Sequence, residues 1–234
     1  MAAGDTRRCS SPFAVSQGSV HLMDMATPRI RRTQEQRSTD TRKALVDGAV
    51  RAIYRLGYGG ATTAVVAEEA GISRGSIIFH FSTRAELMAE VMRTIYEQER
   101  EEYDRLEREL NLGHHALDWV EMCWQVLSKP TGVAFLEIQM AARSDPELAE
   151  KVSSVSSSLE QDGVATLMPR FGGDAEQTLA AIRLVVWAIR GYSVGRMIVP
   201  DPDEMDRPVE LFKQMYRAGL KAGVFGPRPT SKER

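Results

Sequence analysis

Apolar residues recur at three- and four-residue intervals from about Thr39 onward. Leu45, Ala49, Ile53 and Leu56 form the first such stripe, which is the pattern of a helix that buries one face. The stretch LGYGG follows directly, and glycine tolerates the left-handed backbone of a helix end. The spacing therefore predicts a first helix that ends at these glycines.

Two short helices and a tight turn are expected next. Thr62 or Thr63 can cap a helix that runs to about Ala70, where Gly71 breaks the pattern. Ser73 can cap a third helix of about two turns. Residues 39–88 thus predict a helix, a second helix, a tight turn, a third helix and a connector.

The rest of the chain also has the pattern of helices. The stretch TRAE, residues 83–86, fits the capping box of a long fourth helix that reaches Glu109. No later stretch alternates as a strand does. Cap residues at Asp145, Asp174 and Asp201 mark three further starts. The later helices are expected near 114–128, 131–143, 146–168, 175–198 and 203–222. The fold class is all-α.

Composition and charge narrow the class of protein. A chain of 234 residues with 43% hydrophobic residues can bury a sizeable core. The net charge is -2, but residues 29–55 hold eight basic and three acidic residues, and residues 97–109 hold three basic and seven acidic ones. A basic front and an acidic remainder suggest a polyanion bound at one end. The acidic run 97–109 is expected to be a solvated helix face.

The cysteines and the apolar runs indicate the compartment. Cys9 and Cys123 lie far apart and form no CxxC pair, which favours a reducing environment. No secretory leader and no uninterrupted apolar run of membrane-spanning length occurs. We expect a soluble, cytoplasmic protein.

The second and third helices have the layout of a helix-turn-helix, in which the second helix of the motif enters a DNA major groove about 12 Å wide. Arg74 can donate two hydrogen bonds to a guanine, Ser76 can reach a base or a phosphate, and Phe79 can pack on a thymine methyl. The alternatives are a phosphate-bound or solvated arginine and a packed phenylalanine. Ile72, Ile77 and Phe81 are expected in the core.

Four flanking side chains are candidates for phosphate contacts. They are the hydroxyls of Thr62 and Thr63, the ring of His80 and the guanidinium of Arg84. For His80 the alternative is a packed or exposed ring. The arginines at 29, 31 and 32 form either an arm along the minor groove or a solvated tail.

The stretch from Thr41 to Met92 resembles the DNA-binding domain of the tetracycline-repressor-like (TetR) family. The matching features are GY after the first helix, ATT at the second, A-x-x-AG-I-S-x-G through the turn, and F-x-x-R-x-x-L, where the family often has lysine at the place of Arg84. One departure is Ile78, where the family often carries a phosphate-binding tyrosine. The resemblance implies a three-helix DNA-binding domain followed by a helical bundle for an effector and for dimerisation.

The expected domains are a flexible arm (1–36), the helix-turn-helix domain (37–84), an effector-binding and dimerisation domain (85–224) and a tail (225–234). No catalytic motif such as HExxH, GxSxG or a P-loop occurs. His114 and His115 are adjacent, so they cannot face one metal site on a helix. We expect no enzyme activity, no cofactor and no metal.

Adaptable and aromatic side chains in the larger domain are candidates for a largely hydrophobic effector site, with plain core as the alternative. The candidates are Trp119, Met122, Cys123, Phe135, Ile138, Gln139, Met168 and Trp187. Glu137 and Arg143 are further candidate polar anchors. The resemblance also implies a dimer through the last two helices, with the monomer core as the alternative. The interface candidates are Ile182, Val186, Ile189, Phe212, Met215 and Tyr216.

The sequence therefore predicts a homodimeric, DNA-binding transcriptional regulator that binds a palindromic operator. We expect a repressor that a small-molecule effector releases. One alternative is an activator, or a ligand-independent DNA-binding protein of the same fold. A more distant alternative is a helical enzyme with an accessory DNA-binding domain.

Overall fold

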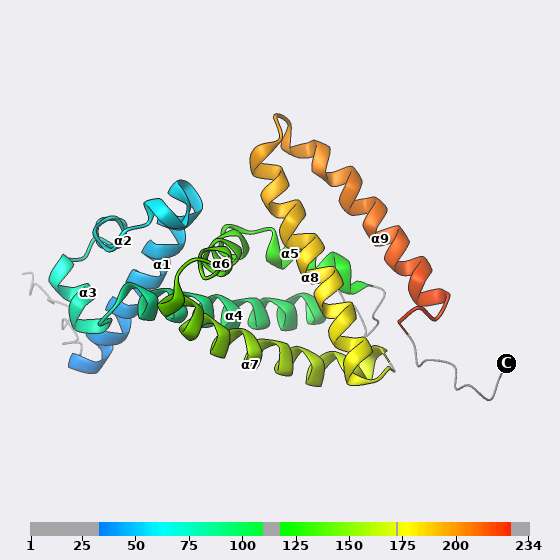
Figure 1. Ribbon diagram of the computed structural model, residues 1–234, viewed down its shortest axis with the longest axis horizontal. Coiled ribbons are helices and arrows are strands. Elements are labelled where there is room, and N and C mark those ends of the chain that lie inside the picture. Colours follow the sequence, from blue (N-terminus) through cyan, green and yellow to red (C-terminus); the bar gives the residue numbers. More distant parts are fainter. Residues whose placement is uncertain (1–32, 110–117, 172, 226–234) are drawn as a thin grey trace, which may run out of the picture. The chain divides into compact units, whose positions relative to one another are not determined.

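The computed structural model describes residues 33–109, 118–171 and 173–225. The chain divides into two compact units, and the described residues from Gln34 onward all belong to the second. Every long element among them is an α-helix and none is a strand (Figure 1), so the all-α fold class is confirmed. Within the described ranges, no helix is both long enough and apolar enough to cross a bilayer. The elements are α1 (Gln34–Gly60), α2 (Thr63–Ala70), α3 (Arg74–His80), α4 (Arg84–Glu109), α5 (Trp119–Leu127), α6 (Pro130–Ala141), α7 (Pro146–Phe171), α8 (Ala175–Ile198), the short 3-10 helix η2 (Pro202–Met205) and α9 (Asp206–Lys221).

Side-chain caps begin the two short helices at the residues that the sequence predicts. The Thr62 hydroxyl accepts from the Val65 N–H, and the Ser73 hydroxyl accepts from the Ser76 N–H. Gly71 ends α2 in the left-handed conformation at φ 66°, which a side chain would disfavour. Local hydrogen bonding therefore sets the turn between α2 and α3. The first helix starts earlier than expected, at Gln34.

The first hydrophobic core joins the three N-terminal helices to the larger domain. Leu45 and Ile53 of α1 are fully or almost fully buried, as are Met92 of α4 and Ile138 of α6, and all four belong to one cluster. Helix α1 packs on both α2 and α6. The core thus runs continuously across residues 84–85, and the division into domains there stays a prediction.

A polar clasp around Tyr58 holds the end of α1. Gly57 has φ 71° and bends the chain, after which the Tyr58 N–H donates to Glu137 Oε2 at 3.1 Å. The Tyr58 carbonyl accepts from Arg84 Nη2, and the guanidinium of Arg84 lies 4.0 Å from the centre of the Tyr58 ring. The clasp therefore connects α1 to α6 and to the first residue of α4.

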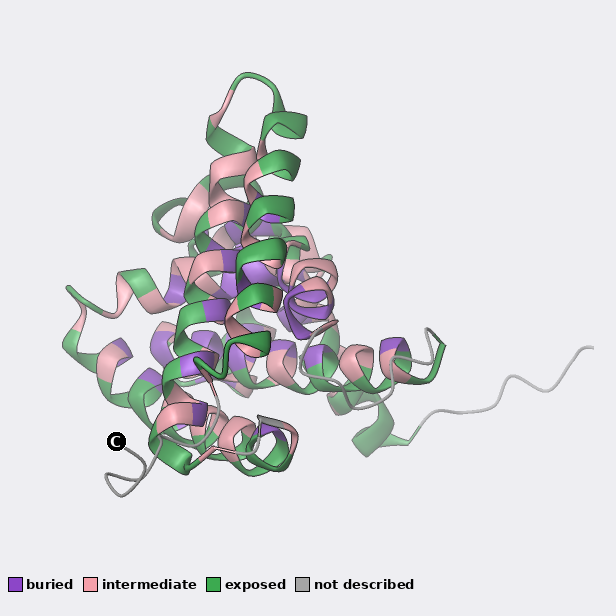
Figure 2. Cartoon of the chain, turned by 90° about the vertical axis from the view of Figure 1, so that its right-hand side faces the viewer, coloured by how far each residue is buried: buried purple, intermediate pink, exposed green. Residues whose placement is uncertain are grey.

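A second core lies among α5, α8 and α9 and the far ends of α4 and α7. It includes Leu106, Cys123, Val185, Ile189 and Tyr216. Figure 2 shows the buried positions on the sides of these helices that face one another. The predicted starts are confirmed, because Asp145 caps α7, Asp174 with Gln177 forms the capping box of α8, and Asp201 opens η2.

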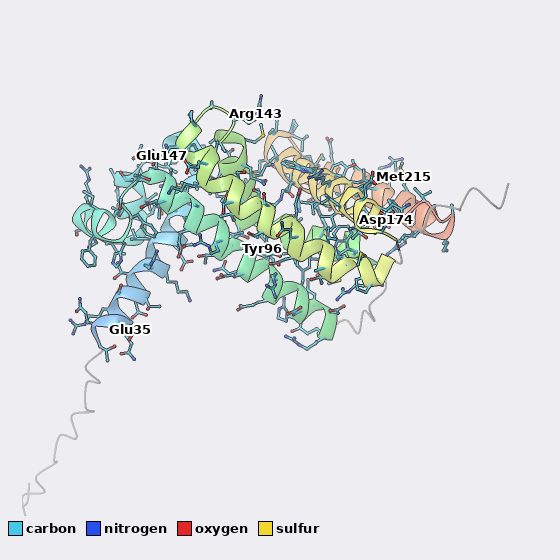
Figure 3. All side chains as sticks on the ribbon, turned by 60° about the horizontal axis from the view of Figure 1, so that its bottom comes forward. Glu35, Tyr96, Arg143, Glu147, Asp174 and Met215 are labelled. Carbon is cyan, nitrogen blue, oxygen red and sulfur yellow. The ribbon has the colours of Figure 1, made fainter. Side chains whose placement is uncertain are left out.

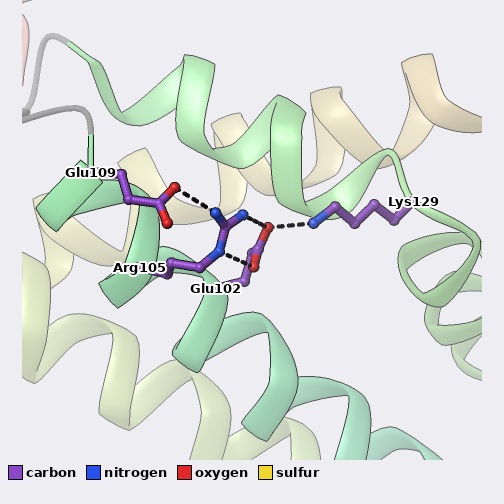
Figure 4. Close-up of polar contacts among 4 residues, drawn as sticks. All are labelled: Glu102, Arg105, Glu109 and Lys129. Atoms are coloured by element: carbon purple, nitrogen blue, oxygen red, sulfur yellow. Dashed lines mark hydrogen bonds and ion pairs between the residues drawn. The ribbon is translucent and has the colours of Figure 1, made fainter.

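An exposed ion-pair network fastens the last turns of α4 to the start of α6 (Figure 4). Arg105 donates through Nε and Nη2 to the two oxygens of Glu102, at 2.9 and 2.6 Å, and its Nη1 lies 2.5 Å from Glu109. Lys129 Nζ lies 2.5 Å from Glu102. The hydrogen bonds from Arg105 and Lys129 lower the pKa of Glu102 to about 2. The carboxylate therefore stays ionised across the physiological range.

Gly48 marks the closest approach of α1 to α2. A Cβ at this position would lie 2.9 Å from both the Cβ and the backbone N of Ala70. Backbone atoms cannot move aside easily, so we predict that Gly48→Ala lowers the free energy of unfolding by about 1–3 kcal/mol. Thermal unfolding measures the loss. The control is Gly59→Ala, because a Cβ there meets nothing within 4 Å; equal stability of the two variants would contradict the prediction.

Candidate nucleic-acid interface and ligand cavity

Helix α3 is held by one face and presents the other to solvent. Ile77 and Phe81 are 4% and 5% exposed and pack into the first core, as predicted. On the opposite face Ile78 and Phe79 are 75% and 79% exposed. Large apolar side chains with so much exposed surface usually mark a contact with another molecule.

The polar candidates on α3 lie on or near the same exposed side. Arg74 is exposed, and it makes no hydrogen bond or ion pair within the described part of the chain. Ser76 is half-buried, with its hydroxyl 3.1 Å from that of Ser73. The His80 ring meets the Phe79 ring edge-on at 5.2 Å. The structure thus gathers Arg74, Phe79 and His80 on one short helix.

The three other DNA-contact candidates flank α3 and differ in exposure and in the hydrogen bonds that they already make within the chain. Thr62 and Thr63 are exposed at the start of α2, and the Thr62 hydroxyl also serves as the cap. Arg84 is half-buried, since one of its nitrogens donates to the Tyr58 carbonyl. The arginines at 29, 31 and 32 lie outside the described residues.

Part of the basic front is neutralised within the chain. Arg51 and Arg55 both pair with Glu69 of α2, and Arg42 lies 3.6 Å from Glu90 of α4. The charge of this region available to a polyanion is therefore smaller than the sequence count implies, whereas Arg74 has no acidic partner among the described residues.

A cavity of about 270 Å³ lies among α4, α5, α6, α7 and α8. The residues of helix α4 that line the cavity are spaced three or four apart, which places them on one face of the helix. Helix α7 runs beside α4 and also contributes to the lining (Figure 3). Five aromatic rings line the cavity: Tyr96, Tyr103, Trp119, Phe135 and Trp187. Its charged lining residues are Glu99, Arg100, Asp104, Glu107, Glu160, Arg170, Arg183 and Arg190.

A buried ion pair between α4 and α8 lines this cavity. Glu99 and Arg190 are 6% and 4% exposed, with Arg190 Nη2 3.5 Å from Glu99 Oε2. Arg190 Nη1 donates to the Gly132 carbonyl at 2.8 Å, and the guanidinium lies 4.3 Å from the centre of the Phe135 ring. Burial raises the pKa of Glu99, and the charge and hydrogen bond of Arg190 oppose that rise.

Five of the eight sequence candidates line the cavity: Trp119, Met122, Phe135, Gln139 and Trp187. Cys123, Ile138 and Met168 do not. Cys123 is fully buried behind the wall, 3.6 Å from the Tyr103 hydroxyl, and burial raises the pKa of its thiol to about 12. Ile138 packs in the first core, and Met168 is 38% exposed on α7. A stripe of Met and aromatic residues does not reveal which side a helix turns to a cavity.

The acidic run of residues 97–109 is not wholly a solvated face, which corrects the expectation from its charge. Glu99 is buried, and Tyr96, Glu99 and Tyr103 face the cavity from one side of α4. The spacing of 96, 99 and 103 fits a single helical face. This spacing in the sequence indicates a face turned to the interior, but the many acidic residues around it make the segment look like a solvated face. Of the other polar candidates, Glu137 holds Tyr58 instead, and Arg143 is exposed.

The interface candidates on the last two helices divide into two groups. Ile189 and Tyr216 are 0% and 2% exposed, so they belong to the core of the single chain and cannot meet a partner. Ile182, Val186 and Phe212 are half-buried against that core. Met215 is 64% exposed on α9 (Figure 3). The other large apolar side chains with an exposed surface on α8 and α9 are Leu184, Trp187, Met197, Ile198 and Leu211.

Among the described residues, no group of three or more His, Cys, Asp or Glu side chains is arranged to hold a metal ion. His114 and His115 lie outside the described residues. The chemistry of both regions is that of binding surfaces, one on an exposed helix face and one in a cavity between helices.

Comparison with known proteins identifies the family of the helix-turn-helix region. Residues 45–91 match the family model described as bacterial regulatory proteins, tetR family. An uncharacterised HTH-type transcriptional regulator of Mycobacterium tuberculosis is 25% identical over 81% of this chain and 99% of its own length.

Solved structures show the same fold at lower identity. A TetR transcription regulator from Haloarcula marismortui superposes with a TM-score of 0.59, 16% identity, and coverage of 77% of this chain and 98% of its own. The multidrug binding protein EbrR, complexed with imidazole, gives a TM-score of 0.56, 21% identity, and coverage of 82% and 98%. Residues 45–91 thus carry the helix-turn-helix of the tetR family of bacterial regulatory proteins, and the solved structures show that the chain shares the fold of a TetR transcription regulator.

Proposed function

We propose that the protein is a homodimeric repressor that leaves its operator when a small molecule occupies the cavity. The observation that carries the proposal is that two of the helices that line the cavity also pack against the DNA-binding helices. Helices α4 and α6 line the cavity, and both also pack on α1. A ligand in the cavity therefore touches the two helices that position α1 to α3.

The exposed face of α3 supports major-groove recognition. Arg74 would donate a pair of hydrogen bonds to a guanine, and Ser76 would reach a base edge or a phosphate. Phe79 would pack on a thymine methyl, the apolar group of that groove. Thr62, Thr63, His80 and Arg84 would contact phosphates, which position the helix without reading sequence.

The outer faces of α8 and α9 support a dimer. Leu184 and Ile198 on α8 and Leu211 and Met215 on α9 are half or more exposed, and such apolar surface favours association. A two-fold dimer would also present two copies of α3 to the two halves of a palindrome. Ile189 and Tyr216 have no part in this surface because they are buried.

The cavity supports control by a small molecule. Its aromatic lining suits a largely apolar ligand, and the solved structure of EbrR shows that a protein of this fold can hold a small molecule. A ligand alters operator affinity only if it binds the two arrangements of the protein unequally. The Tyr58 clasp offers a connection, because Glu137 lies on the same helix as the cavity residues Phe135 and Gln139.

Selection of bound genomic fragments by the purified protein tests the DNA-binding part of the proposal. We expect palindromic fragments, whose affinity falls steeply as salt rises because bound phosphates release counterions. Recovery of no common site, together with an affinity independent of salt, would contradict it.

The first variant prediction concerns Arg74. On the recovered operator, Arg74→Ala should lose roughly 1–3 kcal/mol of binding free energy, the range for a bidentate contact to a base. Competition with random DNA separates the two kinds of contact. If Arg74 contacts a base, Arg74→Ala loses more affinity for the operator than for random DNA; if Arg74 contacts a phosphate, the loss is the same for both. Arg93→Ala is the control, because Arg93 is an exposed arginine of α4 already paired with Glu90. Equal affinity of Arg74→Ala and the unaltered chain would refute the contact.

The second variant prediction concerns Phe79. Replacing thymine by uracil in the half-site removes single methyl groups, and each methyl packed on Phe79 should be worth about 0.8 kcal/mol, or about fourfold in affinity. The Phe79→Ala variant should bind both versions equally. If both proteins lose the same affinity on uracil DNA, Phe79 does not read the methyl.

The third variant prediction concerns the dimer. Leu184→Glu combined with Met215→Glu places charge on the outer face of α8 and α9, so the protein should sediment as a 26.0 kDa monomer and bind the operator more weakly. Met140→Glu is the control, because Met140 is a similarly exposed methionine on α6. A double variant that stays dimeric would place the interface elsewhere.

A further inference from the structure

One oxygen of the buried Glu99 carboxylate has no hydrogen-bond donor. Glu99 is 6% exposed, and its Oε1 is buried without a partner among the described residues. A buried acceptor left unpaired costs roughly 1–3 kcal/mol, and more when it carries charge. Since Glu99 lines the cavity, a ligand that brings a donor removes this cost.

The side chains of Arg190 and Tyr103 direct their hydrogen-bond donors to groups other than Oε1. Arg190 gives Nη1 to the Gly132 carbonyl, rests on the Phe135 ring and turns Nη2 toward Oε2, the other oxygen of Glu99. The Tyr103 hydroxyl donates to Cys123 Sγ at 3.6 Å. Oε1 exposes almost no surface, so a ligand would reach it through a modest rotation about the soft terminal torsion of the glutamate.

The other charged residues that line the cavity indicate the charge of the ligand that it can hold. Arg170 lies 3.0 Å from Glu107, and Arg183 donates twice to Glu160, at 2.9 and 2.8 Å. With Arg100 and Asp104 added, the cavity has four acidic and four basic residues, and their formal charges cancel. The lining as a whole therefore has no net attraction for an ion, and burying a charged ligand would be costly.

The rings and the volume set the shape. Tyr96, Tyr103, Trp119, Phe135 and Trp187 offer planar apolar surfaces on several sides, which favour stacked or edge-on contact with another ring. A volume of about 270 Å³ lies just below the usual range for drug-sized ligands, so the space suits one or two rings.

We propose that the cavity binds a small, neutral aromatic molecule with a hydroxyl or N–H group that donates to Glu99 Oε1. This inference rests on the proposed function, in which the cavity is the effector site, and it adds the chemical class of the effector. The donor would join the ligand to α4 through Glu99 and indirectly to α8 through Arg190. An anion would instead meet the Glu99 carboxylate.

Four matched probes on one scaffold test the inference with the full chain. They are 4-hydroxybiphenyl, 4-methoxybiphenyl, biphenyl-4-carboxylate and 4-(aminomethyl)biphenyl, and calorimetry or the fluorescence of Trp119 and Trp187 reports their binding. The hydroxyl compound should bind about tenfold to a hundredfold more tightly than its methyl ether, as expected for a hydrogen bond to a charged acceptor. The carboxylate and the ammonium compound should bind more weakly than the hydroxyl compound.

Two variants locate the effect. In Glu99→Gln the amide oxygen would turn to Arg190 and leave an N–H₂ group toward the cavity, so the preference for the hydroxyl over the ether should disappear. In the control, Glu160→Gln, the preference should persist, because Glu160 lines the cavity with both oxygens held by Arg183. If Glu99→Gln fails to fold, the four probes on the unaltered chain still decide.

The possible failures are distinguishable. Equal binding of hydroxyl and ether, tighter binding of either ion, a preference that survives Glu99→Gln, or no binding at all overturns the inference. If the carboxylate binds best and releases the operator, the proposed function stands and the assigned ligand class is wrong. If the hydroxyl compound binds through Glu99 without weakening operator binding, the ligand class stands and the proposed switch is wrong.

Discussion

The packing of α4 into both hydrophobic cores is the constraint on which the rest of the structure depends. Its first half places Met88, Met92 and Ile95 in the core shared with the DNA-binding helices, and Leu106 near its end lies in the core of α5, α8 and α9. A helix of 26 residues spans roughly 39 Å. Because the helix is continuous, a shift at one end must be accommodated at the other.

Polar groups on α4 contact neighbouring elements at particular points, and they define the sites. Between the two cores Glu99 faces the cavity and pairs with Arg190 of α8, and an ion pair removed from water is costly to break. At the start of α4 Arg84 donates to the Tyr58 carbonyl. Near its end Glu102 accepts hydrogen bonds from both Arg105 and Lys129. The cavity therefore lies along the second half of α4, where the helix has polar contacts that an occupant can change.

The local parts of this description follow from the order of residues. Thr62, Ser73 and Asp174 cap the helices that the sequence assigns to them, since a cap needs only a hydroxyl or carboxylate within three residues of the N–H it accepts. The inward positions Ile77 and Phe81 follow from helical spacing around the turn. The expectations failed where a helix has neighbours on several sides. Ile189 and Tyr216 lie inside the chain, Met168 faces outward, and Glu99 is buried within an acidic run.

By itself the sequence determined the all-α class, the capped starts of α2, α3, α7 and α8, the glycine turn and the buried side of α3, because these depend on interactions a few residues apart. Only the tertiary structure decided which side of α4 faces the cavity and which acid pairs with Arg190. It also decided which apolar residues of α8 and α9 stay exposed. These features depend on contacts between residues 58 and 137, or 99 and 190, whose meeting requires the packing of whole helices. An amphipathic pattern gives each helix a buried side, and the neighbour that covers it is set only when all the helices pack together.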